Sequence, residues 1–397
     1  MTNSNIGRSD VVLLEGVRTP FGSFGGSLSG FSATELGIIA AKGAISKSGL
    51  PAGNVDYVIF GNAMQTSADA IYLARHVGLG AGVPQSAPAV TINRLCGSGF
   101  ESIIQAARTL MLGESSFVLA GGAESMSMAP HSSWGMRWGT RLKDDKMVDL
   151  LWAALYDPVA KLSMAETAEK LADIKNISRI EVDEYALLSQ ERTADAQKEG
   201  RFDEEIIAVR DENEDEILSV DEHPRSETTI DALSNLKPYF KENGTVTAGN
   251  ASGISDGAAA LIVTTADNAE KRDLKPFGKL ISWGIAGCDP TIMGIGPVPA
   301  SELALKRAEL TLDDIDLVEI NEAFSPQYLA VEKELGLKRE LTNVNGGAIA
   351  LGHPLAATGT RLTMTILYEL RRRGLKRGLA SACIGGGQGT AVIVETV

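Results

Sequence analysis

Cysteine and histidine are scarce in this chain, whose 397 residues include three cysteines and four histidines. Three cysteines cannot build a disulfide framework in a protein of this length, and no CxxC pair or His/Cys cluster has the spacing of zinc ligands. The sequence therefore predicts no metal site, and it favours a reducing compartment.

Long hydrophobic runs and an excess of positive charge are also missing. The longest apolar stretches, such as residues 257–263, are far too short to cross a bilayer. Residues 1–10 are polar and carry only Arg8 as a basic residue, so neither a secretory signal nor a transit peptide is readable. A formal net charge of -14 argues against a nucleic-acid partner. We expect a soluble cytoplasmic protein without a membrane partner, or a protein of the mitochondrial matrix if its source is eukaryotic.

Hydrophobic residues make up 44% of the chain, which is enough for a large core and two or more domains. The order strand, strand, glycine-rich turn, helix, strand occurs twice. Continuous apolar strands that alternate with helices predict parallel sheets covered on both faces. Any α/β protein shows such alternation, but the matching glycine-rich turns favour two duplicated halves. The predicted elements are strands 56–61, 89–93 and 116–122 with helix 99–111, and strands 316–321, 342–345 and 378–383 with helix 358–373.

Residues 124–248 differ in character from both halves. They are rich in methionine at first, then helical and charged from Glu166 to Arg201, and then acidic. This pattern predicts an inserted domain that could cover a site. The predicted division is an N-terminal half of residues 1–123 plus 249–276, the inserted domain 124–248, and a C-terminal half 277–397.

Cys96 lies where a strand-like run gives way to a glycine-rich turn and then a helical run, in Asn93–Gly99. A thiolate is the reactive form of cysteine, and a helix N-terminus stabilises the anion and lowers the pKa of the thiol. The position therefore predicts a nucleophile, with a small buried thiol as the alternative interpretation.

Two polar residues of the second half are candidates to assist Cys96. His353 lies in the glycine-crowded segment Asn345–Pro354, where a ligand could approach the backbone closely, and it is the obvious base for the thiol. The alternative interpretation is a structural histidine whose ring nitrogens form hydrogen bonds within the turn. Asn321 follows an apolar strand at the carboxyl edge, where open α/β sheets bind ligands, and a solvated loop is the competing interpretation.

Cys383 lies in a second glycine-rich bend, Ser381–Gly389, almost at the other end of the chain from Cys96. Two thiols in two such turns suggest a paired site. The third cysteine, Cys288, is interpreted as filling a gap in the core.

Taken together, these segments resemble the thiolase family, and the resemblance covers nearly the whole chain. Each segment alone is modest, but the ordered set is highly specific. Within the family, Asp69–Leu79 and Gly287–Pro290 resemble the mitochondrial-type 3-ketoacyl-CoA thiolases. The segments that carry the family resemblance are Arg18–Gly22, Asn93–Gly99, Gly244–Gly253, Met293–Pro297, Asn321–Phe324, Gly346–Pro354 and Cys383–Gly389.

The resemblance implies a thiolase fold with five layers, α/β/α/β/α, built from two similar halves with an inserted loop domain, and assembly as a homodimer or homotetramer. It implies an acyltransferase that cleaves 3-ketoacyl-CoA, including acetoacetyl-CoA, with coenzyme A (CoA), and that also catalyses the reverse Claisen condensation. Such chemistry serves fatty acid metabolism and β-oxidation. CoA is then substrate and product, and no cofactor is needed.

The resemblance also implies the roles of the site residues. Cys96 would hold the acyl group as a thioester. His353 would activate that thiol and, with a water held by Asn321, stabilise the enolate of acetyl-CoA. Cys383 would exchange the proton at the acetyl α-carbon, and the backbone N–H groups of Cys96 and Gly385 would bind the tetrahedral oxyanion.

The resemblance also implies which residues bind CoA, from its adenine to the acyl group that it carries. For one of them, Arg225, the alternative interpretation is an ordinary surface arginine with no binding role. Many short-chain relatives carry a histidine where this chain has Ser163, and the smaller serine is compatible with longer 3-ketoacyl chains. The implied set is Arg225 near the adenine, Ser252, Ala248 and Gly249 along the pantetheine, and Met164, Met293 and Phe324 at the acyl end.

Two other functions stay open. A decarboxylating ketoacyl synthase of the same fold generally uses two histidines, or His and Asn, in place of a second cysteine, so Cys383 disfavours it. A CoA-binding or lipid-binding protein without turnover is expected to have lost Cys96, His353 or Cys383, and all three are present.

Overall fold

The computed structural model describes residues 10–142, 144–211 and 213–397. The segment predicted to lack a secretory signal falls almost entirely on residues 1–9 and so lies outside the described part. Within those three ranges, no helix is long and apolar enough to span a bilayer.

The N-terminal half is built on a mixed group of strands. β4 (Tyr57–Gly61) pairs in parallel with β5 (Ala89–Ile92) on one side and with β6 (Phe117–Ser125) on the other. β6 then pairs antiparallel with β13 (Ser255–Thr265), which carries the short strands β2 (Val17–Arg18) and β3 (Gly22–Ser23) along its length.

The C-terminal half repeats this plan with its own four strands. β15 (Leu317–Ile320) is parallel to β16 (Arg377–Ile384), which forms a hairpin with β17 (Gln388–Thr396), and β17 pairs antiparallel with β14 (Gly278–Gly287). β1 (Val11–Leu13) pairs with both β13 and β14 and joins the two halves into one 11-stranded sheet.

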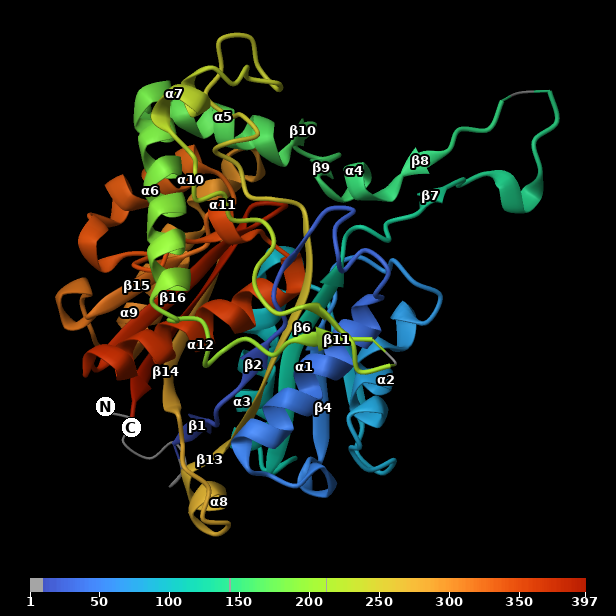
Figure 1. Ribbon diagram of the computed structural model, residues 1–397, viewed down its shortest axis with the longest axis vertical. Helices are drawn as coiled ribbons and strands as arrows, with labels where there is room; N and C mark the ends of the chain where they lie inside the picture. The colour runs from blue at the N-terminus through green and yellow to red at the C-terminus, as the bar shows by residue number, and fades with distance from the viewer. Residues whose placement is uncertain (1–9, 143, 212) are drawn as a thin grey trace.

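Helices cover both parts of this sheet and give five layers, which confirms the predicted arrangement (Figure 1). α1 (Ala33–Ser48) and α2 (Leu73–Gly80) pack on the outer face of the N-terminal strands. α3 (Ser98–Met111) and α12 (Leu355–Arg373) lie between the two parts of the sheet. α9 (Pro297–Ala308) and α10 (Ser325–Leu335) cover the outer face of the C-terminal strands.

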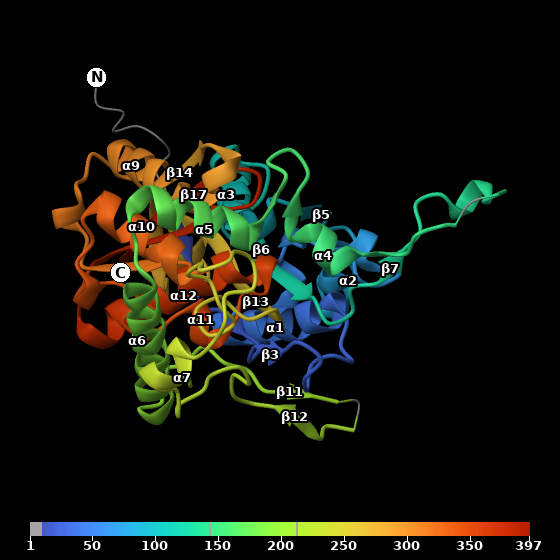
Figure 2. The ribbon, with the colours of Figure 1, turned by 90° about the horizontal axis from the view of Figure 1, so that it is seen from above.

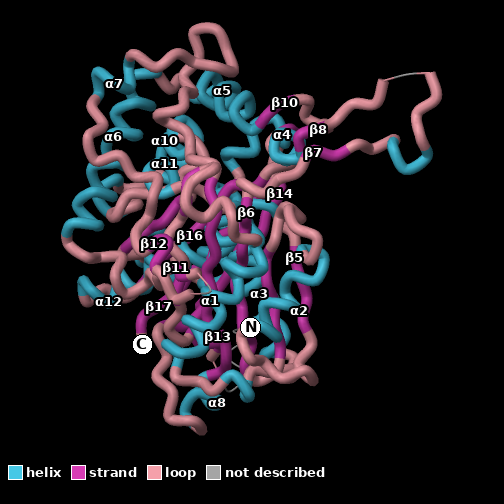
Figure 3. Tube along the Cα trace, turned by 45° about the vertical axis from the view of Figure 1, so that its right-hand side comes forward, coloured by secondary structure: helices cyan, strands magenta, loops and turns pink. Residues whose placement is uncertain are grey.

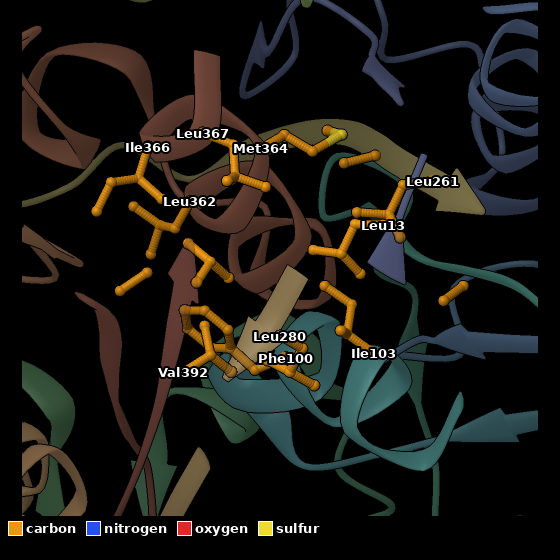
Figure 4. Packing of buried hydrophobic residues seen from close by; sticks show 14 of the residues in the cluster. Leu13, Phe100, Ile103, Leu261, Leu280, Leu362, Met364, Ile366, Leu367 and Val392 are labelled. Carbon is orange, nitrogen blue, oxygen red and sulfur yellow. The ribbon is translucent and has the colours of Figure 1, made fainter. Parts of the chain in front are cut away.

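The central layer holds the largest apolar cluster, in which side chains of α3 and α12 meet those of the sheet (Figure 4). The two helices cross at glycines. A Cβ atom on Gly99 would lie 2.5 Å from the Thr360 nitrogen, and one on Gly359 would lie 2.3 Å from the Phe100 nitrogen. This close crossing brings the N-termini of α3 and α12 together, and with them the segments that carry Cys96 and His353.

The elements predicted from the sequence are largely confirmed, with two corrections. The sheet is not parallel throughout, because the turn at Gly385–Gly387 is too short to join parallel strands and makes β16 and β17 antiparallel. Residues 342–345 form no strand and only two isolated bridges, from Thr342 to Val318 and from Val344 to Gly346. There the Asn343 side chain makes the two hydrogen bonds with Ile320 that the backbone of a neighbouring strand would otherwise make. It accepts the Ile320 N–H at 2.8 Å and donates to the Ile320 carbonyl at 2.9 Å.

The segment predicted as an insertion lies over one end of both halves (Figures 1 and 3). Its two long helices are α5 (Met164–Lys175) and α6 (Arg179–Lys198), which match the predicted helical and charged stretch. Both begin with a capping box, at Ser163 with Glu166 and at Ser178 with Glu181. The remaining strands and α-helices of this segment are β7 (His131–Ser132), β8 (Val148–Asp149), α4 (Leu150–Ala154), β9 (Tyr156–Asp157), β10 (Leu162–Ser163), β11 (Val209–Arg210), β12 (Glu216–Leu218) and α7 (Ile230–Ser234). Two further short helices lie outside this segment, α8 (Ala266–Glu270) in the N-terminal half and α11 (Ala348–Leu351) in the C-terminal half.

Candidate active site

Cys96 sits in a strained turn directly before α3. The turn is a single 3-10 stretch, Leu95–Gly97, and Leu95 has a left-handed φ of 46°. A leucine in that conformation is unfavourable, so neighbouring groups must hold it. The Asn93 side chain accepts the Leu95 N–H at 2.9 Å, and the Ser98 hydroxyl accepts the Arg94 N–H at 2.8 Å.

The Cys96 thiol is a protonated group at neutral pH. It packs against an apolar cluster that includes Met64, Met126 and Leu355, and this burial raises its pKa to about 11. The Gly385 N–H opposes the shift and the Glu124 carboxylate adds to it, each less strongly than burial. The expectation that the helix N-terminus lowers this pKa is wrong, because the apolar surroundings outweigh the helix dipole.

His353 is buried just before α12, and its ring is fixed from both sides. Nδ1 lies 2.6 Å from the Thr358 hydroxyl, which itself donates to the Pro354 carbonyl at 3.0 Å. The hydroxyl therefore accepts, and Nδ1 carries the proton. The other nitrogen, Nε2, lies 3.3 Å from the Asn321 amide nitrogen and is the acceptor of the ring.

The imidazole of His353 is neutral over the physiological range. Burial lowers its pKa to about 3, and the buried cation of Arg361 lowers it further. The lone pair on Nε2 of this neutral ring faces the Asn321 amide nitrogen and is the one that can take a proton from a thiol. The pair Cys96 and His353 is thus a thiol with a neutral base, and a thiolate forms only when the proton moves.

The sequence predicted that the glycines around His353 would let a ligand approach the backbone closely. In the structure, other protein atoms occupy the space beside these glycines, which corrects that prediction. A Cβ atom on Gly346 would meet the Thr193 hydroxyl at 2.0 Å, one on Gly347 the Glu322 carboxylate at 2.4 Å, and one on Gly352 the Ser255 hydroxyl at 2.1 Å. Gly346 and Gly352 also have positive φ angles of 76° and 96°. These glycines shape the loop that presents His353.

Asn321 follows the end of β15 and is almost fully buried, so the solvated-loop interpretation is wrong. Its N–H donates to the Ser381 carbonyl at 2.8 Å, which fixes it beside the neighbouring strand. In the part of the chain that the structure describes, its side-chain oxygen has no hydrogen-bond partner. A buried acceptor of this kind is available to a water or to a substrate donor.

Cys383 lies within β16, opposite Gly389 of β17, and so precedes the glycine-rich bend. Its side chain is completely buried in a small cluster with Met293 and Ala323, against which Met164 and Phe324 pack. Burial raises the pKa of this thiol well above its usual value, and the neighbouring thiols of Cys96 and Cys288 raise it further. The two predicted thiols are therefore neighbours, and both are protonated at rest.

An apolar pocket opens between the two halves and the inserted segment, and His353 forms part of its wall together with the predicted residues Ser252, Met164 and Phe324. Other lining residues were not predicted. Some belong to the apolar cluster against which Cys96 packs, so the pocket borders that cluster. Among these unpredicted residues, only Met126 lies in a segment with a recognisable sequence pattern, the methionine-rich start of the insertion. The other unpredicted residues lie in no such pattern. The unpredicted lining side chains are Met126, Trp152, Leu155, Phe240, Ile254 and Leu355.

The other predicted CoA residues lie around this pocket but not in its wall. Ala248 is exposed, and Gly249 faces the side chains of Leu233 and Leu236. Arg225 is exposed, and its guanidinium forms no ion pair with a described residue. Its charge helps to lower the pKa of His223, whose ring abuts Gly253 in the pocket wall.

Two protein-family models match the chain end to end. The N-terminal domain of thiolase matches residues 11–267, and the C-terminal domain of thiolase matches residues 274–396. The chain belongs to the thiolase family. Thiolases are acyltransferases, so the thiol and imidazole described above lie in the fold of an enzyme class that transfers acyl groups.

Known thiolases are similar to this one over almost their whole length. Bovine mitochondrial 3-ketoacyl-CoA thiolase is 52% identical, covering 97% of this chain and 98% of the relative. The β-ketothiolase BktB of Cupriavidus necator is 46% identical, covering 98% and 99%. The crystal structure of human mitochondrial 3-ketoacyl-CoA thiolase in complex with CoA superposes with a TM-score of 0.96 at 52% identity, covering 98% of each chain. The predicted thiolase fold is thus confirmed.

Proposed function

We propose that this thiolase cleaves 3-ketoacyl-CoA with CoA, giving acetyl-CoA and a shortened acyl-CoA, and that it also catalyses the reverse condensation. One observation carries the proposal: a neutral imidazole, whose acceptor Nε2 faces the Asn321 amide, lines an apolar pocket that borders the cluster against which a protonated Cys96 packs. CoA is substrate and product in this scheme, and no resident cofactor takes part.

Cleavage begins with acyl transfer to Cys96. His353 Nε2 takes the Cys96 proton, and the sulfur attacks the 3-keto carbonyl carbon. The oxyanion that forms accepts hydrogen bonds from the backbone N–H groups of Cys96 and Gly385, both of which act on the Cys96 sulfur in the resting protein. Breaking the C2–C3 bond leaves the acyl group on Cys96 and releases acetyl-CoA as its enolate.

Cys383 then completes the first half of the reaction. Its thiol donates a proton to the enolate carbon, while protonated His353 and a water held by Asn321 stabilise the enolate oxygen. The thiol of an incoming CoA gives its proton to the Cys383 thiolate, its sulfur takes the acyl group from Cys96, and His353 returns its proton to the Cys96 thiolate that is released. The strongly raised pKa of Cys383 supports the cleavage direction, because the resting thiol already carries the proton that the enolate needs.

Two groups of side chains divide the pocket between CoA and the acyl chain. Ser252, Met164 and Phe324 line its wall, and we assign Ser252 to the pantetheine and Met164, Phe324 and Met293 to the acyl end beside the thioester. Ala248, Gly249 and Arg225 are assigned to the outer part of CoA, where the exposed guanidinium supplies a cation for a phosphate. The apolar cluster at Cys96 is left for the acyl chain.

The acyl end favours substrates longer than acetoacetyl-CoA. Met64, Met126, Leu151 and Leu355 form an apolar cluster in contact with Cys96, and methionine side chains adapt easily to chains of different length. Ser163 is compatible with this, since its hydroxyl caps α5 and adds little bulk to the pocket wall.

A kcat/KM series over 3-ketoacyl-CoA substrates of increasing length, with free CoA, tests both proposals. We expect kcat/KM to rise on lengthening the acyl chain from acetoacetyl-CoA, by about threefold to tenfold per two methylenes until the apolar cluster is filled. Tight binding of CoA without turnover of any substrate would instead identify a binding protein. A strict optimum at acetoacetyl-CoA would contradict the acyl assignment alone.

We propose that the protein assembles as a homodimer through β5 and as a homotetramer through a projecting arm. β5 pairs only with β4 among the described strands and leaves an open edge, beside which Ile71, Tyr72 and Val90 are exposed. The arm is formed by the described residues of the loop between β7 and β8, 133–142 and 144–147, and it projects from the body in two perpendicular views (Figures 1 and 2).

The arm carries far more exposed apolar surface than a solvated loop would need. Trp134 is 75% exposed, Trp138 is 89% exposed and Met147 is 63% exposed. Large exposed aromatic side chains in one segment mark a surface that another molecule covers. A second dimer of this chain supplies an identical arm.

Replacing residues 133–147 with a short Gly/Ser linker is expected to halve the particle mass, from tetramer to dimer. Ser132 and Val148 are paired partners at the base of the arm, so a short linker can join them without disturbing the body. Light scattering after gel filtration gives the mass, with Val220→Ser as a control at another exposed apolar residue. An unchanged mass in the shortened protein would rule out the arm as the contact.

We further propose a reducing compartment, the cytoplasm or the mitochondrial matrix. All three cysteines are free, which suits such a compartment. The mammalian relatives carry the word mitochondrial in their names. The division into residues 1–123 plus 249–276, 124–248 and 277–397 is likewise our proposal for the structural units.

A further inference from the structure

Glu124 is a completely buried carboxylate at the end of β6 that no proposed step uses. It accepts four hydrogen bonds. Oε1 receives the Asn62 side-chain amide at 3.1 Å and the Met64 N–H at 2.9 Å. Oε2 receives the Ala63 N–H and the Ala356 N–H, each at 3.1 Å. Such a count of donors requires a carboxylate, because a glutamine offers only one acceptor oxygen.

The four donors come from two segments that flank the active site. Residues 62–64 follow β4 in the N-terminal half, and Ala63 and Met64 belong to the apolar cluster in contact with Cys96. Ala356 lies in the first turn of α12, three residues after His353, in the C-terminal half. One carboxylate therefore ties the surroundings of the nucleophile to the helix that follows the base.

Electrostatics adds a second link between Glu124 and Cys96. Burial, with a smaller contribution from Asp256 on β13, raises the pKa of Glu124 to about 7, although the N–H groups of Met64, Ala63 and Ala356 favour the anion. Glu124 is the charged group that raises the pKa of Cys96, and the Cys96 thiol in turn raises the pKa of the Cys383 thiol on β16.

We propose that Glu124 is a positioning residue for acyl transfer, which holds the Cys96 turn and the start of α12 at the separation that lets His353 serve Cys96. This inference rests on the proposed function of Cys96 and His353. The carboxylate does not touch the reacting atoms. It acts through the backbone of residues 63, 64 and 356 and through its charge.

Geometry and charge can be separated with two variants. Glu124→Gln removes the charge and keeps the size, so it should release some of the donors and make Cys96 easier to ionise. Glu124→Asp keeps the charge but is one methylene too short to reach both segments. Asp56→Asn is the matched control, because Asp56 also accepts two backbone N–H groups, from Ser116 and Phe117, but at the opposite end of β4 and β6.

The first measurement is the pH dependence of Cys96 alkylation by iodoacetamide, read peptide by peptide with mass spectrometry. A charge near a thiol shifts its pKa, so in Glu124→Gln the midpoint should move down by about one pH unit, and in Glu124→Asp it should stay within about 0.3 of the wild type. Superimposed profiles for Glu124→Gln and wild type would overturn the electrostatic link.

The second measurement is the split between kcat and KM in thiolysis. Both Glu124 variants should lose kcat by about tenfold to a hundredfold, with KM for CoA changed less than about threefold, since misplacement of a base costs rate more than binding. Asp56→Asn should match the wild type in both assays. An unchanged kcat in Glu124→Asp would overturn the positioning role. If the wild type shows no turnover, the proposed function fails, and the alkylation profile still tests the link to Cys96.

Discussion

Replacing Cys96 with serine is expected to lower kcat for thiolysis by at least about 10³-fold, because the step that forms the acyl-enzyme is lost. A serine hydroxyl is far less acidic than a thiol. Burial lowers the pKa of the His353 ring to about 3, so the ring is a weak base. It can accept the proton of a thiol for a short time, but it cannot remove the proton of an alcohol. The thioester that would store the acyl group therefore does not form.

The loss is measured in two ways. Disappearance of 3-ketoacyl-CoA absorbance gives the rate, and the mass of the intact protein after mixing with substrate shows whether an acyl group is attached. Cys288→Ser is the matched control, since its half-buried thiol faces the Met293 carbonyl at 3.9 Å and lies outside the pocket wall. A Cys96→Ser protein that turns over at the wild-type rate would show that another group is the nucleophile.

Replacing Cys383 with alanine is expected to lower cleavage and condensation by at least about 10³-fold and to leave acyl transfer nearly intact. In the proposed mechanism Cys383 moves the proton at carbon, whereas Cys96 and His353 suffice to exchange an acyl group between two CoA molecules. The buried side chain loses one sulfur atom, so the free energy of unfolding should fall by only about 1–2 kcal/mol. Loss of activity would then be chemical and would not reflect unfolding.

Labelled CoA makes the distinction. Exchange of label between acetyl-CoA and free CoA reports acylation of Cys96 alone, and thiolysis reports both half-reactions. We expect exchange within about tenfold of wild type and thiolysis near background. If exchange and thiolysis fall together, Cys383 acts on the Cys96 step, and the two-thiol division of labour is wrong. A circular dichroism melt of the variant checks that the fold is retained.

The resting protonation states imply how the rate depends on pH. Proton transfer from Cys96 to His353 is internal and needs no hydroxide. The pKa values of about 11 and about 3 lie on either side of neutrality, so both groups keep their resting states across that range. Glu124, with a pKa of about 7, is the buried group near Cys96 whose charge changes there. Glu124→Gln should therefore flatten this part of the profile.

Sequence patterns were reliable where a property is local. The apolar run of β4 and the alternation of strands and helices identified most of the core elements, because burial of a continuous strand leaves a direct mark in composition. The glycine-rich segments that carry Cys96 and Cys383 also singled out two thiols that the fold makes neighbours. The failure at residues 342–345 is equally local, because Asn343 uses its side chain where a strand would use its backbone.

By itself, the sequence determined the family resemblance, the two-halved plan and the identity of the candidate nucleophile, base and second thiol. Only the tertiary structure decided their chemical state. The helix position of Cys96 predicted a lowered pKa, but packing of distant side chains such as Met64 and Leu355 raises it, because desolvation depends on everything that surrounds a group. The role inferred for Glu124 is also tertiary, since its four donors are brought together only when the two halves dock.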